Sequence, residues 1–138
     1  MCLEKNRDAT EKFRKKNKNK RKVVVWKIYC VDNNNIVSPA IYDDGGCTNP
    51  GYIESDRIDK YQDEYDMCNT INRGIHVYVS RGKAREMRDI GEKIFKCTAK
   101  IDDLVAVGGY RSGRKDEAVF MKIHISKEEF EKGIKGRN

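Results

Sequence analysis

Apolar and polar residues alternate along several stretches of the chain, a pattern typical of strands with one buried face. Residues 23–31, VVVWKIYCV, predict a central strand with Val24, Trp26, Ile28 and Cys30 on one face. Further strands are predicted over residues 75–79, 93–100, 104–109 and 118–125. In the last of these, the residues expected to face the core are Val119, Met121, Ile123 and Ile125.

Capping signals predict three helices. Asp8 and Glu11 have the spacing of a capping box, which predicts a short helix over residues 9–16. Ser80 is placed to cap a second helix that ends near residue 91. The apolar positions of that helix are Ala84, Met87 and Ile90. A second capping box, at Ser126 and Glu129, predicts a C-terminal helix.

Residues 36–42 contain Pro39 and predict an edge strand, and the glycines of residues 43–51 predict a loop. Helical spacing of apolar residues predicts an amphipathic helix over residues 58–68. Several links between predicted strands are too short for parallel crossovers. The pattern therefore predicts one α+β domain over residues 23–138, with a mostly antiparallel, twisted sheet of about six strands and two to four short helices. Residues 1–22 are expected to be a basic extension, either a short helix or disordered.

Charge changes this picture because it is segregated along the chain. The net charge of +7 is the balance of +8 over residues 1–27, −7 over residues 28–66 and +6 over residues 67–138. In residues 12–22, eight of eleven side chains are Lys or Arg, with Phe13 interleaved. Such a run attracts a polyanion through counterion release, although like-charge runs also occur as solvated tails. The acidic middle either balances these charges internally or presents a mimic of nucleic acid.

The candidate nucleic-acid-binding residues combine this run with the basic loop GGYRSGRK, residues 108–115, whose arginines suit phosphate contact. They are Lys12, Arg14, Lys15, Lys16, Lys18, Lys20, Arg21, Lys22, Arg111, Arg114 and Lys115.

A candidate pocket follows from the two histidines of the chain. If the strands of residues 75–79 and 118–125 are neighbours, polar side chains line one cleft: His76, Tyr78, Ser80, Lys122 and His124. The alternative, which we favour, is that His76 is structural and hydrogen-bonds a backbone carbonyl or a carboxylate.

No cofactor or metal is indicated. GGYRSGRK lacks the Gly-Lys-Ser/Thr ending of a phosphate loop, and the five cysteines form no CxxC pair. The cysteines are expected to be free thiols in a reducing cytoplasm. Because no stretch is apolar for the roughly 20 residues of a membrane span, no membrane partner is expected.

The runs GIHVYVSRGKA, KIFKCTAKIDDLVAVGG and EAVFMKIHISKEEFEK resemble small proteins of bacteriophages, mobile elements and giant viruses, over roughly residues 23–130. That resemblance implies a phage or viral protein acting in the host cytoplasm and no particular activity. The order of elements around HVYVS is also similar to that of ADP-ribosyltransferase-like domains, including RNA 2′-phosphotransferases. This second likeness implies a nucleotide-binding enzyme that uses the His76 face.

Three functions are thus in competition. The first is a small basic protein that binds nucleic acid or a host ribonucleoprotein, with inhibition of host defence, in the manner of an anti-CRISPR protein, suggested by the resemblance alone. The second is the ADP-ribosyltransferase-like or nucleotide-binding enzyme. The third is a protein interaction domain that binds no nucleic acid. The basic run of residues 12–22 favours the first, with a polyanion as the partner.

Overall fold

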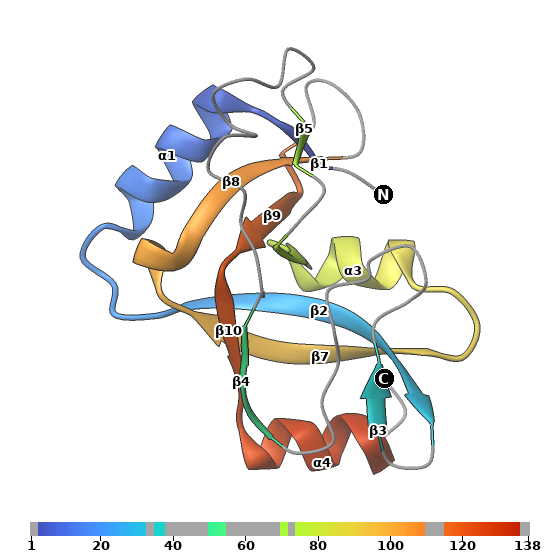
Figure 1. Ribbon diagram of the computed structural model, residues 1–138. Coiled ribbons are helices and arrows are strands. Elements are labelled where there is room, and N and C mark those ends of the chain that lie inside the picture. Colours follow the sequence, from blue (N-terminus) through green and yellow to red (C-terminus); the bar gives the residue numbers. More distant parts are fainter. Residues whose placement is uncertain are drawn as a thin grey trace.

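The computed structural model describes residues 3–32, 35–37, 50–54, 70–71, 74–109 and 115–135. Within these residues the chain forms one sheet of ten strands, three α-helices and one 3-10 helix (Figure 1). The strands are β1 (Leu3–Lys5), β2 (Val23–Asp32), β3 (Asn35–Val37), β4 (Gly51–Glu54), β5 (Thr70–Ile71), β6 (Ile75–Tyr78), β7 (Glu92–Ala99), β8 (Leu104–Gly109), β9 (Glu117–Phe120) and β10 (Lys122–Ile125). The helices are α1 (Arg7–Asn17), α3 (Arg81–Met87) and α4 (Lys127–Lys135), and η1 (Ile101–Asp103) joins β7 to β8.

The strand order is β4-β10-β7-β2-β6-β9-β8-β1-β5, with β3 paired to β2, and every pairing among the described strands is antiparallel. An α+β fold with an antiparallel sheet is therefore confirmed. The expected number of about six strands was too low. The strands that the sequence did not predict, β1, β4 and β5, have only two to four residues each, which is too short for alternation to be recognised. β3, which pairs with β2, is the described beginning of the edge strand predicted over residues 36–42.

The predicted strand over residues 118–125 is two strands that meet at Met121. β9 pairs with β6 and β8, whereas β10 pairs with β7 and β4. The Met121 N–H donates to the Asp103 carbonyl oxygen at 2.8 Å, opposite η1. Met121 itself is 44% exposed, so its predicted place in the core was wrong. The extra residue changes the phase of the alternation, and Phe120 and Ile123 both reach the core.

Because β9 continues into β10, the path from β10 through β7, β2 and β6 to β9 returns to its starting strand. The sheet therefore curls around its main core, which includes Val25, Phe95, Phe120 and Ile123. Strand β2 alternates as predicted. Its core-facing residues Val23, Val25 and Tyr29 are buried, and the opposite face carries Val24, Trp26, Ile28 and Cys30.

A buried lysine lies among the core residues of β2. Lys27 is only 1% exposed, and its Nζ donates to the His76 carbonyl oxygen at 2.9 Å. The same ammonium lies 5.3 Å from the centre of the Tyr29 ring. These contacts stabilise a charge that would otherwise be costly to bury.

The first helix begins earlier than predicted. Asn6, not Asp8, is the N-cap of α1: Asn6 is extended and its Oδ1 accepts the Ala9 N–H at 3.0 Å. The Thr10 hydroxyl accepts the Val107 N–H of β8 at 2.9 Å, and the Arg14 Nη2 donates to the Leu104 carbonyl oxygen at 3.0 Å. Residues 3–17, assigned from the sequence to the basic extension, thus form a strand of the sheet and a helix bonded to it.

The other two helices begin at the predicted caps. The Ser80 Oγ accepts the Lys83 N–H, and the Ser126 Oγ accepts the Glu129 N–H, each at 3.2 Å. Ala84 is fully buried, but Met87 and Ile90 are exposed, because the backbone becomes extended at residue 88 and ends α3 there. The Lys83 ammonium donates a hydrogen bond to the Asp116 carboxylate, with Nζ 3.3 Å from Oδ2. This bond is the main reason that the pKa of Lys83 is raised.

Some predictions fall outside the described residues: the helix over residues 58–68, most of the loop over residues 43–51, the residues around Pro39, and the tip of the basic loop with Arg111 and Arg114. Most of the acidic middle of the chain also lies outside them.

The close packing of α4 on the sheet generates the first test. A Cβ at Gly133 would overlap the Phe95 ring, which is buried and packs edge-on against Tyr29 with ring centres 5.7 Å apart. Gly133→Ala should therefore destabilise the protein by about 1–3 kcal/mol, although alanine is the better helix former. Gly82 of α3 has open space around it, so Gly82→Ala should stabilise the protein by up to about 1 kcal/mol. Urea unfolding measures both, and a Gly133→Ala protein as stable as Gly82→Ala would contradict this packing.

Candidate nucleic-acid interface

The predicted His76 cluster is not assembled. Two strands, β7 and β2, lie between β6, which carries His76 and Tyr78, and β10, which carries Lys122 and His124. Ser80 is used as the cap of α3. The prediction assumed that the strands of residues 75–79 and 118–125 are neighbours throughout, but only the β9 half pairs with β6.

His76 has a structural environment. It is 5% exposed, its Nδ1 lies 3.3 Å from the Gly74 carbonyl oxygen, and its own carbonyl oxygen accepts from Lys27. All four residues of β6 are buried, so this strand is covered on both faces, not on one as its alternation predicted. The favoured interpretation of His76, a histidine bonded to a backbone carbonyl, agrees with this geometry.

Lys122 and His124 belong instead to an exposed surface on the outer side of the sheet. Directly paired residues in an antiparallel sheet point to the same face. Val24 pairs with Thr98, Thr98 with His124, and His124 with Tyr52, so one row crosses β2, β7, β10 and β4. Trp26 and its partner Lys96 lie in the next row. Lys122, two residues before His124, is on the same side of β10. We call the surface of these seven residues the open face.

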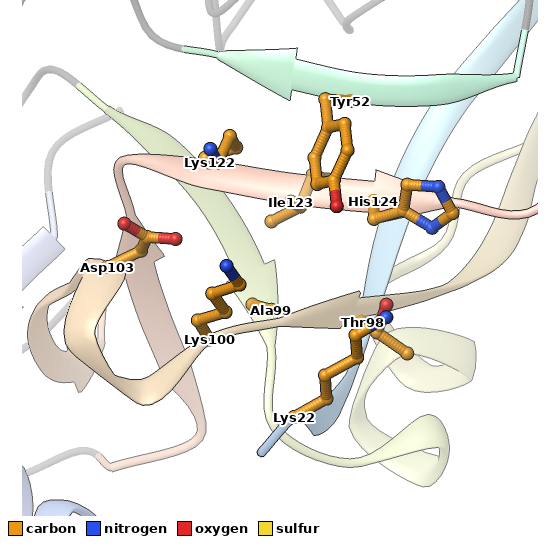
Figure 2. Close-up of a pocket in the computed structure, with 9 residues that line it drawn as sticks. All are labelled: Lys22, Tyr52, Thr98, Ala99, Lys100, Asp103, Lys122, Ile123 and His124. Carbon is orange, nitrogen blue, oxygen red and sulfur yellow. The ribbon is translucent and has the colours of Figure 1, made fainter.

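A shallow hollow forms part of the open face, and Figure 2 shows the side chains around it. Its lining is Lys22, Tyr52, Thr98, Ala99, Lys100, Asp103, Lys122, Ile123 and His124. The space is about 10 Å³, enough for one water molecule, so a larger ligand would lie across the hollow and not inside it. Three lysines and one aspartate make its surroundings positive.

Tyr52 is the most exposed aromatic side chain of this surface. It is 58% exposed, and its ring centre lies 4.7 Å from that of His124 at an angle of 61°. The Lys122 Nζ lies 5.0 Å from the Tyr52 ring centre and 3.7 Å from the Glu54 carboxylate. The Lys122 ammonium therefore lies over one face of the ring, and more than half of the Tyr52 side chain is still exposed to solvent.

The basic segment, residues 12–22, runs from α1 to the start of β2 (Figure 1). Its last residue, Lys22, lines the hollow (Figure 2). All eight of its cationic side chains are exposed: Lys12, Arg14, Lys15, Lys16, Lys18, Lys20, Arg21 and Lys22. Phe13 and Ala9 pack against the main core and attach α1 to the sheet. The aromatic residue within the run therefore serves the fold, whereas the charges face solvent.

Sequence reasoning found Lys122, His124 and the basic segment but missed Tyr52, Thr98 and Lys100. Tyr52 follows a glycine-rich loop, and only pairing with β10 shows that it lies beside His124. Of the three candidate nucleic-acid-binding residues in the basic loop, only Lys115 lies within the described part of the chain, and it is exposed.

Other site types find no support in the described residues. The described residues contain no group of His, Cys, Asp and Glu able to hold a metal ion. None of the helices that they form is long and apolar enough to cross a membrane. Cys30 and Cys97 are free thiols, and burial, followed by the charge of Glu92, raises the pKa of the Cys30 thiol. Comparisons with family models, curated proteins and solved structures found no match to this chain.

The two histidines provide the test of this arrangement. His76→Ala should lower the free energy of unfolding by about 1–3 kcal/mol, because it removes a buried hydrogen-bonding side chain. His124→Ala, on the half-exposed outer side of β10, should change it by no more than about 0.5 kcal/mol. Equal effects in urea unfolding would show that the two environments have been assigned wrongly.

Proposed function

We propose that this protein binds nucleic acid, with phosphates held by the basic segment and bases placed against the open face. The observation that carries the proposal is the continuity of charge and aromatic surface: eight exposed cations end at Lys22, which lines the same hollow as the exposed Tyr52 ring. Lysine and arginine side chains supply affinity for phosphates, and exposed aromatic rings on a sheet stack on unpaired bases.

The open face suits single strands better than duplexes. An exposed ring can stack only on a base whose face is accessible, and the bases of a duplex are already stacked on one another. Tyr52, His124 and Trp26 occupy three strands of the same sheet surface. Roughly 14 Å, three strand spacings, separates the outer two strands, so a short single-stranded segment would span the surface.

The resemblance to phage and viral proteins extends the proposal to one biological role. A protein of this kind would inhibit host defence by occupying the nucleic acid, or the nucleic-acid-binding surface, of a host ribonucleoprotein. The enzymatic alternative has less support, because the described residues do not bring a second chemically active side chain to His76 on one exposed surface.

Substitutions in the basic segment test the proposal. Removal of the whole segment is unsuitable, because residues 3–17 contribute a strand and a helix to the fold. Lys15→Gln with Lys16→Gln should instead weaken binding to a single-stranded oligonucleotide roughly tenfold near 0.1 M salt, and should lower the slope of log affinity against log salt by about 0.7 for each phosphate that is no longer neutralised. Fluorescence anisotropy at several salt concentrations measures both quantities.

The matched control is Lys127→Gln with Lys135→Gln, two exposed lysines of α4 that line neither the hollow beside Tyr52 nor the cavity beside Trp26. This pair removes the same net charge and should change affinity by less than the first pair. If the two pairs weaken binding equally, or if the wild-type protein binds no oligonucleotide, the proposed function is wrong.

A further inference from the structure

A second cavity lies further along the open face, beside the only tryptophan of the chain. Its lining comes from both strands and helices: Trp26 of β2, its partner Lys96 and Ile94 of β7, Arg81 of α3, and Glu129, Lys132 and Gly133 of α4. Its volume is about 220 Å³. We call it the Trp26 cavity.

The charge around the Trp26 cavity is unbalanced. Three of its lining side chains, Arg81, Lys96 and Lys132, are cationic, and one, Glu129, is acidic. Among the residues that the structure describes, none of the three cations has a carboxylate within ion-pair distance. This excess of positive charge among the described lining residues favours an anionic ligand, and arginine in particular suits a phosphate.

Size and aromatic character limit that ligand further. Pockets for complete small molecules usually measure roughly 300–1,000 Å³, so a cavity of about 220 Å³ holds a single ring system. The half-buried Trp26 indole provides an apolar surface for that ring, and the cations at the rim remain for a phosphate attached to it. A nucleobase with its adjoining phosphate has this combination of properties.

The Trp26 cavity and the hollow beside Tyr52 are lined by neighbouring residues of β7. Lys96 lines the first and Thr98 the second, and the two are on the same side of β7, two residues or roughly 7 Å apart. A strand that crosses the hollow would therefore reach the cavity within about one nucleotide.

We propose that the Trp26 cavity is the subsite for one unpaired nucleobase, whose phosphate contacts Arg81, Lys96 and Lys132. This assignment rests on the proposed function and adds to it a defined subsite in which one base and its phosphate are recognised together. The same chemistry is present in a free nucleoside monophosphate and in a nucleotide of a single strand.

Trp26 fluorescence reports on the cavity directly because no other tryptophan contributes. A short oligouridylate should quench it saturably and bind about 5- to 150-fold more tightly than an abasic oligonucleotide of the same length and charge. In anisotropy measurements Trp26→Leu should reduce this advantage of the base-bearing strand, because only stacking at Tyr52 remains, whereas Trp26→Phe should keep most of it. Circular dichroism melting checks that each variant is folded. Arg81→Ala, at an exposed position, should weaken oligonucleotide binding without loss of stability.

The outcomes separate this inference from the proposed function. If Trp26→Leu leaves the ratio of the two affinities unchanged, nucleic-acid binding stands and the base subsite is overturned. If neither oligonucleotide binds, the proposed function fails. A titration with uridine monophosphate then tests whether the Trp26 cavity binds a free nucleotide. Saturable quenching of Trp26 fluorescence by this nucleotide would show that the cavity is a nucleotide site. Absence of quenching would overturn the assignment of the cavity too.

Discussion

The bend at Met121 determines how the sheet closes. The hydrogen bond from Met121 to Asp103 sits where β9 becomes β10 and where η1 interrupts the strand opposite. On one side of the bend β9 pairs with β6, and on the other side β10 pairs with β7, which pairs with β2. Since β2 and β6 also pair with each other, the sheet closes around one core. The phase change at the bend lets both β9 and β10 contribute apolar residues to that core.

This closure determines which side chains are left for binding. Most residues on the inner side of β2, β7 and β10 are buried, and α3 covers only the part of the outer side around Ala84, Ile28 and Ile94. The remainder of the outer side carries Tyr52, His124, Trp26 and several lysines. The hydrogen bonds of Thr10 and Arg14 attach α1 to β8, so the basic segment reaches β2 at Lys22, next to this surface. The fold therefore joins charge and aromatic rings that are far apart in the chain.

Local sequence patterns predicted the strands and helices whose formation depends on residues close together in the chain. Alternation located β2, β6, β7 and β8, and the serine caps located α3 and α4, because period and capping act within a few residues. Strand order depends on pairing between distant segments, and for that reason the placement of His76 beside His124 was wrong and the neighbour of His124, Tyr52, was missed. The phase change at Met121 was likewise invisible, since a bulge leaves the run of apolar residues intact.

The basic segment and the open face together form the outer surface to which we assign the binding of single-stranded nucleic acid. Backbone amide NMR shifts recorded during titration with a short oligouridylate would map that surface residue by residue. We expect the largest shifts in β4, β10, β7 and β2 around Tyr52, His124, Thr98 and Trp26, and in residues 12–22, with little change at core residues near His76. Shifts centred on β6 around His76, or no shifts at all, would contradict this assignment.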